Sequence, residues 1–206
     1  MSTDYIDRIN SQYRGVIIDS HNFRDEQTIS VKKEAIIELF KFLRDDPELD
    51  FKFLMDLTAV DYLNRKDNRF EVVYHFYSLK HNGRLRVKIP VSEDDCTIDS
   101  VSSLWKTANW YEREVWDLYG IKFKGHPDMR RLLLPEDWEG HPLLKNYEYP
   151  EEYHDIDHYR PDPLDQFKAL DDLVAKAKEK KAEETASDSA TGTQEGEDDA
   201  SESSEE

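Results

Sequence analysis

A pair of carboxylates, Glu112 and Glu114, lies in the most chemically promising stretch of this 206-residue sequence. Two neighbouring carboxyl groups can act together as a general acid and a general base. On a helix, however, residues two positions apart point to different sides, so the two groups would not face one substrate. We therefore interpret both as ion-pair partners of arginines, either Arg113, Arg130 and Arg131 of this chain or arginines of another chain.

Two histidines, His126 and His141, each stand between a glycine and a proline. Histidine titrates near neutral pH, so these rings could relay protons. We favour the alternative, a structural role in which each imidazole hydrogen-bonds to a carbonyl of its own turn. Proline holds the histidine extended and glycine permits a tight turn, so each segment is predicted to present one basic residue. The two segments are Gly125-His126-Pro127-Asp128-Met129-Arg130 and Gly140-His141-Pro142-Leu143-Leu144-Lys145.

A third group, His154 and His158, has the spacing of two metal ligands on one face of a helix. The segment lies among prolines and acidic residues and lacks the glutamate of a His-Glu-x-x-His motif, so we predict no metal site there. The alternative from a different class is a stand-alone metal-dependent hydrolase that uses these two histidines.

The sequence contains no recognisable device for holding a redox cofactor. It has no glycine-rich dinucleotide motif, no phosphate-binding loop and no Cys-x-x-Cys, so we predict no cofactor in this chain. The single cysteine, Cys96, can form neither an internal disulfide nor the four-ligand set of an iron–sulfur cluster. One thiol of this kind fits a reducing compartment.

Charge and hydropathy exclude further classes of function. The net charge of −18 disfavours nucleic acid or anionic lipid as the main ligand. No apolar run approaches the ~20 residues of a membrane span, and the first residues match neither a signal peptide nor a transit peptide. We therefore expect any membrane association to come only through partners.

The element that must position these groups is a helix that starts near Asn109. Asn109 and Glu112 have capping-box spacing, and Gly120 stands where a left-handed residue would end the helix. Arg113 and Asp117 are four positions apart and are predicted to pair across one turn. The predicted apolar face of this helix comprises Ala108, Tyr111, Val115 and Leu118.

All four tryptophans lie between Trp105 and Trp138, within a stretch over residues 105–147 that carries seven positive and seven negative charges. Large aromatic side chains beside pairable charges are typical of a buried or partner-facing surface. Core and interface remain open as roles for the tryptophans, and we expect both roles for different residues.

Hydrophobic periodicity predicts a two-layer α+β domain with a mostly antiparallel sheet covered by helices, followed by an extended C-terminal arm. The predicted helices before the tryptophan-rich stretch cover residues 4–13, 31–44 (capped by Ser30) and, as a short addition, 97–104. The predicted strands lie near residues 16–18, 28–31, 51–56, 70–76 and 84–91, the last two joined by an Asn82-Gly83 hairpin.

Alternation along these strands assigns side chains to faces of the sheet. One set of residues, Phe51, Phe53 and Met55, alternates with more polar positions. Two other sets are predicted to share the buried face: Phe70, Val72, Tyr74 and Phe76 in one strand, and Leu85, Val87, Ile89 and Val91 in the next. The helix over residues 31–44 is the predicted cover of that face.

The chain changes character after Pro150. Residues 151–180 are predicted to form an extended acidic, aromatic arm and a last helix over residues 164–180. Residues 181–206 contain ten acidic side chains against Lys181 and no aliphatic side chain larger than alanine. We predict that this tail is disordered and solvated.

One long ordered motif carries a resemblance to a known family. Its residues are Glu112-Arg113-Glu114-x-x-Asp117-Leu118-Tyr119-Gly120-Ile121-x-Phe123-x-Gly125-His126-Pro127-Asp128-x-Arg130-Arg131 and Glu139-Gly140-His141-Pro142-Leu143. The stretches at residues 56–62 and 69–75 agree with it. Over residues 30–150 the chain resembles the thirty-kilodalton subunit family of respiratory complex I, which in bacteria is the C subunit of NADH-quinone oxidoreductase. Residues 1–150 are then the family-like domain, with the signature at 105–147.

The resemblance implies a function without chemistry in this chain. The family serves as a cofactor-free subunit in the quinone module of the peripheral arm of proton-translocating NADH:quinone oxidoreductase. FMN and Fe-S clusters lie in partner subunits, quinone is the substrate of the complex, and the neighbour is the large subunit of the forty-nine-kilodalton type. This implies a peripheral place on the cytoplasmic face of the bacterial inner membrane. A related membrane-bound hydrogenase or other-donor oxidoreductase is the closest alternative.

The resemblance also implies which residues face a partner. We expect Arg113, Glu114, Asp117, Arg130 and Arg131 to form an ion-pair framework, with Trp110 and Trp116 as anchors. Glu112, Gly125, His126, Pro127, Gly140, His141, Pro142 and Lys145 complete the candidate interface. The family usually continues Pro-Leu-Arg-Lys-Asp, whereas this chain has Leu144 and Asn146 in place of the arginine and the aspartate. Their joint absence suggests that a paired contact is lost.

Overall fold

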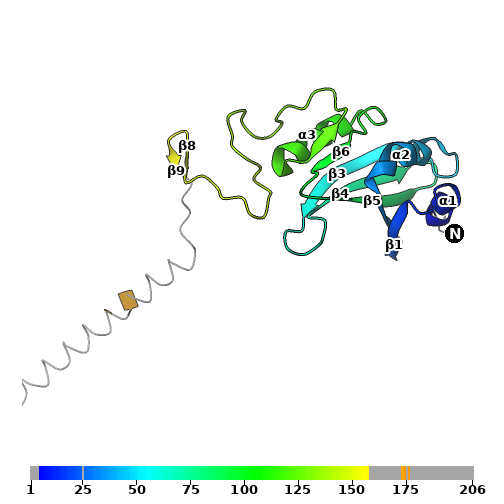
Figure 1. Cartoon of the computed structure of the whole chain (residues 1–206), viewed down its shortest axis with the longest axis horizontal. Coiled ribbons are helices and arrows are strands. Elements are labelled where there is room, and N and C mark those ends of the chain that lie inside the picture. Colours follow the sequence, from blue (N-terminus) through cyan, green and yellow to red (C-terminus); the bar gives the residue numbers. More distant parts are fainter. Residues whose placement is uncertain (1–4, 25, 158–172, 175, 177–206) are drawn as a thin grey trace, which may run out of the picture. The chain divides into compact units, whose positions relative to one another are not determined.

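The computed structural model describes residues 5–24, 26–157, 173–174 and 176. The chain divides into two units, Met1–Tyr149 and Pro150–Glu206. The first unit is built on a five-stranded sheet in the order β1-β2-β5-β4-β3 (Figure 1). Of the neighbouring strands in this sheet, only β2 and β5 run parallel, so the predicted α+β class with a mainly antiparallel sheet is confirmed. The strands are β1 Ile17–Phe23, β2 Glu26–Val31, β3 Phe53–Asp61, β4 Phe70–Ser78 and β5 Gly83–Val91.

The hairpin between β4 and β5 is the best-specified part of the sheet. Asn82 adopts a positive φ of 50°, as a tight turn before Gly83 requires. The predicted apolar sets of both strands are buried on one face, with exposed fractions of 3% or less. Their registers pair Phe70 with Val91 and Phe76 with Leu85, so the two apolar stripes coincide.

The alternating residues Phe51, Phe53 and Met55 do not share one environment, because Phe51 is buried and the other two are exposed. Leu54 is buried, whereas Phe53 and Met55 are 48% and 38% exposed. The register of β3 against β4 shifts between Leu54 and Asp56, which marks a bulge at Met55. An irregularity of this kind breaks the two-residue period of the strand.

Helix α2, Ile36–Asp45, covers the apolar face of the sheet (Figure 1). Its Phe40 ring lies 4.9 Å from each of the rings of Tyr74 and Phe76, and the indole of Trp105 completes this aromatic centre. A 3₁₀ turn, η1 Lys33–Ala35, precedes the helix, and Ser30 lies in β2, so the predicted Ser30 cap is wrong. The other early helix, α1 Tyr5–Gln12, matches its prediction.

A second, small parallel sheet replaces the short helix predicted at residues 97–104. It consists of β6 Thr97–Asp99 and β7 Lys122–Lys124, which flank α3 Ala108–Tyr119 along the chain. Ile98 and Phe123 are buried, so three residues of each strand suffice to anchor both ends of the α3 segment. The signal was too short to separate a strand from a helix by periodicity.

The second unit is described only in part. A two-stranded antiparallel sheet, β8 Glu152–Tyr153 and β9 Ile156–Asp157, lies at its start, with His154 and Asp155 at positive φ in the turn. Leu173, Val174 and Lys176 are helical, within the range predicted for a last helix. The rest of that predicted helix, His158 and the acidic tail lie outside the described residues. In the described part of the chain, no helix is long and apolar enough to cross a membrane.

Candidate subunit interface

Helix α3 organises the candidate site, and it begins earlier along the chain than predicted. Its N-cap is Thr107, without a side-chain capping bond, so the predicted capping box of Asn109 and Glu112 is wrong. Its C-cap is Gly120 at φ 79°, as predicted. A Cβ on Gly120 would lie 2.7 Å from Cδ2 of His141, so both the left-handed conformation and the close approach of His141 require glycine there.

Glu112 is buried, and neither of its contacts is the arginine that we predicted. Its carboxylate accepts hydrogen bonds from the Ser100 hydroxyl (2.6 Å) and the Val101 N–H (2.7 Å). Burial raises the pKa of Glu112 to about 7, opposed by these two donors. Glu112 therefore ties α3 to the segment after β6, while Glu114 on another side of the helix is partly exposed.

Asp117 accepts hydrogen bonds from the segment that follows the first Gly-His-Pro turn. Its Oδ1 accepts from Nη1 of Arg131 at 2.8 Å. Its Oδ2 accepts from the backbone N–H groups of Leu132, Leu133 and Leu134 at 3.0, 2.8 and 2.9 Å. Burial opposes ionisation, but these N–H groups and the guanidinium outweigh it and lower the pKa of Asp117. A fully buried carboxylate thus fixes a segment without regular secondary structure.

Arg113 contacts backbone rather than the predicted Asp117. Its Nε and Nη2 donate to the carbonyls of Arg130 and Arg131, at 3.1 and 2.9 Å. Its guanidinium also lies 4.9 Å from the ring centroid of Trp110, a cation–π distance. The predicted i,i+4 pair is therefore wrong, because the carbonyls of the folded-back segment engage the guanidinium instead.

Arg130 and Arg131 are adjacent in sequence but opposite in environment. Arg131 is 15% exposed at its side chain and bonds to Asp117 and to the carbonyls of Trp138 and Gly140. Arg130 is 69% exposed and pairs with Asp128, two residues away. Of the predicted framework, Arg131 and Asp117 form an internal pair, whereas Arg130 lies at the surface.

Both histidines of the Gly-His-Pro turns bond to carbonyls of α3 rather than to carbonyls of their own turns. Nε2 of His126 donates to the Asn109 carbonyl (3.1 Å), and its Nδ1 accepts from the Asp128 N–H (3.1 Å). Nδ1 of His141 donates to the Asp117 carbonyl (2.8 Å). The His126 ring therefore has both nitrogens occupied as a neutral tautomer. Gly125 and Gly140 hold the two turns at φ 80° and 78°.

A second buried pair, Asp61 and Arg69, escaped the sequence analysis. Arg69 donates two hydrogen bonds to Asp61, and the Lys145 N–H, 84 positions along the chain from Asp61, donates a third at 2.9 Å. Asn146, at the position where the family has aspartate, accepts from Nη2 of Arg69 at 2.5 Å. Only the family motif over residues 56–62 hinted at Asp61.

The tryptophans divide between core and surface. Trp105 is buried in the aromatic centre, whereas Trp110 is 59% exposed and Trp116 lies beside His141 and Arg131. Large apolar side chains are also exposed on the segment after α3, namely Leu133, Leu143 and Tyr149. Together, the exposed indole of Trp110, these exposed apolar side chains and the exposed Arg130 have the composition of a protein–protein contact. Pro127, Pro142 and Lys145 lie partly or fully exposed on the same segment.

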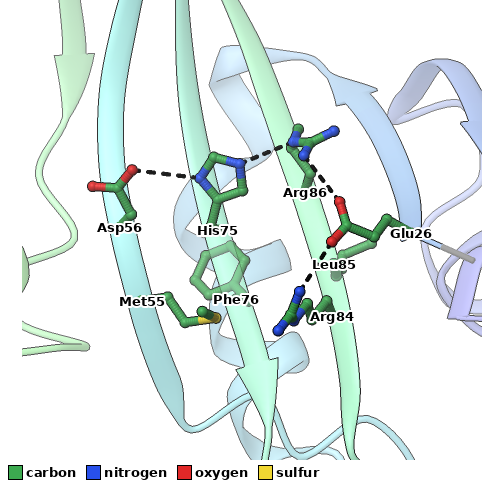
Figure 2. Close-up of a pocket in the computed structure, with 8 residues that line it drawn as sticks. All are labelled: Glu26, Met55, Asp56, His75, Phe76, Arg84, Leu85 and Arg86. Atoms are coloured by element: carbon green, nitrogen blue, oxygen red, sulfur yellow. Dashed lines mark hydrogen bonds and ion pairs between the residues drawn. The ribbon is translucent and has the colours of Figure 1, made fainter. Parts of the chain in front are cut away.

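A separate cavity of about 280 Å³ lies on the face of the sheet away from α2. Figure 2 shows that its charged groups form one chain: Asp56, His75, Arg86, Glu26 and Arg84. Burial, then the Arg86 charge, lowers the pKa of His75, whose Nε2 accepts from Arg86 at 2.9 Å. Each of these charged or titratable side chains forms an ion pair or a hydrogen bond with another member of the set. This arrangement is typical of the surface of a sheet rather than of a reactive group.

No cluster of three or more metal-ligating side chains exists within the described residues, which include His154 but not His158. The Cys96 thiol is half-buried, and burial raises its pKa. The described part of the chain instead offers buried carboxylates, at Asp61, Glu112 and Asp117, that shape a surface.

Comparison with known proteins agrees with this description. The family described as respiratory-chain NADH dehydrogenase, 30 Kd subunit, matches residues 29–153. The C subunit of NADH-quinone oxidoreductase from Geotalea uraniireducens is 51% identical over 140 residues, covering 68% of this chain and 84% of that protein. The C/D subunit of NADH-quinone oxidoreductase from Psychrobacter cryohalolentis is 40% identical over 148 residues, 69% of this chain and 25% of that protein.

A solved structure shares the fold. A chain of the membrane-bound sulfane sulfur reductase, an archaeal respiratory membrane complex, superposes with a TM-score of 0.61 at 21% identity, covering 77% of this chain and 94% of that one. At this identity the likeness concerns the fold alone. The family match spans strands β3, β4 and β5, helix α3 and both Gly-His-Pro turns, and it includes every residue of the candidate interface. The chain therefore belongs to the family of the 30 Kd subunit of respiratory-chain NADH dehydrogenase.

Proposed function

We propose that this chain is the C-type component of the peripheral arm of a proton-translocating NADH:quinone oxidoreductase, and that it acts by shaping its neighbour rather than by catalysing a step. The observation that carries the proposal is the family match over residues 29–153, supported by 51% identity to the C subunit of such an enzyme. Holding a neighbour's geometry is a real contribution, because small misplacements at a reacting centre are costly.

The state of the titratable groups supports a non-catalytic role. Glu112, Asp117 and His126 are occupied by hydrogen bonds within the chain, and Asp61 is occupied by Arg69 and Lys145. A general acid or base needs a lone pair or proton directed at a substrate. The hydrogen bonds of these groups instead fix α3, which carries Trp110, and the segment after it, which carries Arg130. The groups therefore serve to build a surface.

The partner in this proposal is the large subunit of the quinone module, of the forty-nine-kilodalton type. The relative from Psychrobacter cryohalolentis supports a close neighbour of this kind, because its name joins components C and D in one chain. Fusion of two modules in one chain raises the effective concentration of each module near the other. A fused chain is therefore consistent with two components that bind each other. Component D is thus our candidate for that neighbour. FMN and Fe-S clusters would lie in other subunits, with quinone as the substrate of the complex.

We place the complex on the cytoplasmic face of the bacterial inner membrane, with this chain attached peripherally through its partners. In support, no helix in the described residues could span a bilayer, and the chain's net charge of −18 opposes direct binding to anionic lipid.

The test is affinity purification of the tagged chain from gently solubilised membranes, followed by mass spectrometry and an NADH:quinone assay. The proposal expects the large quinone-module subunit together with flavin and cluster subunits and NADH:quinone activity. Recovery of a hydrogenase large subunit without an NADH-binding subunit would mean that the electron donor is not NADH, as in the related membrane-bound hydrogenases. A chain that is recovered alone would refute the proposal.

A further inference from the structure

Strand β1 leaves a bare edge on the five-stranded sheet. It lies at the end of the strand order, and among the described residues it pairs only with β2 (Figure 1). Its residues after the first are exposed. An unpaired edge of this length is a template for another strand, and proteins normally cover or blunt it. The edge therefore calls for either a covering element or a partner.

The opposite edge of the same sheet is covered. Helix α3 packs beside β3, and the Tyr111 hydroxyl donates to the Met55 carbonyl at 3.0 Å. The Trp105 indole donates to the Lys52 carbonyl at 3.1 Å, just before β3 begins. The described residues therefore cover one edge of the sheet with side chains and leave the other edge open.

Strand β1 also lacks the residues that discourage pairing. Its sequence, Ile17 to Phe23, contains no lysine and no proline, and Asp19 is its only acidic residue. Ile18 is 55% and Phe23 is 66% exposed, although both are large and apolar. Two exposed apolar residues on a nearly uncharged edge strand are suited to contact with another chain.

The two apolar residues lie on the same face. The register of β1 shifts between Ile17 and Asp19, so Ile18 is an extra residue in a bulge. Ile18 lines a hollow with Ser30 and Pro90, while Phe23 pairs with Glu26, a member of the charged chain in Figure 2. Both therefore belong to the face away from α2. They are five positions apart along the strand, a span of about 16 Å.

We propose that β1 is a docking edge at which an extended segment of a neighbouring subunit adds a strand to the sheet. This rests on the proposed function, because it takes the partner from the same oxidoreductase. The segment would pair its main chain with β1 and place apolar side chains against Ile18 and Phe23. A neutral or basic segment fits best, since this chain carries a net charge of −18.

The acidic tail of this chain is a poor occupant of the edge. Residues 181–206 carry ten acidic side chains and no β-branched side chain other than threonine, so they have little strand propensity and would add negative charge beside Asp19. A second copy of the chain is the competing occupant, and the experiment distinguishes it.

Hydrogen exchange measured by mass spectrometry tests the proposal, on the full-length chain alone and within the purified oxidoreductase. In the isolated chain, about half of the β1 amides face away from β2 and should exchange rapidly, because antiparallel pairing engages alternate residues. In the complex, those amides should become protected. Unchanged exchange over residues 17–23, with protection at residues 105–147, would overturn the docking edge and leave the proposed function standing.

Matched variants give a second readout. Ile18→Lys combined with Phe23→Lys should lower the recovery of co-purified subunits about tenfold, while Leu79→Lys, an exposed control outside β1, should leave it unchanged. Equal recovery for both would overturn the proposal. So would a wild-type chain that dimerises alone and becomes monomeric in the double variant, since that outcome assigns the edge to a second copy. Failure to recover any oxidoreductase with the wild-type chain would instead overturn the proposed function.

Discussion

Asp117 shows how one buried side chain can replace secondary structure. It accepts one guanidinium and three consecutive N–H groups, which an irregular segment could not otherwise satisfy away from water. We expect Asp117→Asn to lower the free energy of unfolding by about 3 kcal/mol, because the amide cannot accept at both positions and leaves Arg131 without its counter-charge. Thermal unfolding of the full chain measures this.

The pH dependence gives the sign of the Asp117 effect. The pKa of Asp117 is lower in the folded state than in the unfolded state. Its contribution to the free energy of unfolding is therefore present above about pH 4 and is lost as the pH falls through the folded pKa. The melting difference between wild type and variant should therefore shrink in acid. Asp128→Asn, at an exposed pair, is the control and should change little at any pH.

Glu112 should behave in the opposite way. Its pKa is raised to about 7 in the folded state, so the folded chain holds the proton more tightly and this contribution to stability is lost as the pH rises from about 4.5 through 7. Glu112→Gln keeps an acceptor for Val101 and a partner for Ser100 without a charge. We expect the variant to lose this pH dependence, measured as the melting temperature between pH 5 and 8. A slope equal to that of wild type, or its loss in Glu114→Gln instead, would contradict the assignment.

At the level of the element, α3 and the second Gly-His-Pro turn depend on each other through Gly120. Gly120→Ala should destabilise the chain by about 1–2 kcal/mol from the left-handed conformation, and more because its Cβ would meet His141 at 2.7 Å. Gly125→Ala is the matched control, since Gly125 has φ 80° but open space around the added Cβ. Melting temperatures of the two variants should differ, and equal losses would mean that His141 does not pack on the helix end.

The strand elements illustrate the same dependence on neighbours. Alternation placed Phe70 and Val72 correctly because β4 is regular and lies between two partners. It does not place Phe53, because the bulge at Met55 breaks the period beside the contact of Tyr111 with the Met55 carbonyl. Local pattern contains no information on that contact.

For the assembled protein, substitutions at Arg130 and Arg131 should distinguish an effect on assembly from an effect on stability. Arg130→Ala should leave the melting temperature of the full chain nearly unchanged, because an exposed pair contributes about 0–1 kcal/mol, yet it should reduce recovery of the oxidoreductase. Arg131→Ala should lower both, since it removes the partner of buried Asp117. Melting curves and co-purification from membranes measure the two effects. A large melting loss in Arg130→Ala, or full assembly with it, would contradict the division.

The family, the α+β class, the β4–β5 hairpin and the left-handed end at Gly120 could all be obtained from the order of residues along the chain. Each depends on interactions between near neighbours in sequence, or on a motif long enough to be distinctive. The partners of Glu112, Arg113 and Asp117 could not, because a charged side chain has many possible partners and the fold brings it to one. Asp61 meets Lys145 across 84 positions, and no local rule links them. Tertiary packing also decided which edge of the sheet is covered in the described residues. Helix α3 packs beside the β3 edge and cannot also cover the β1 edge.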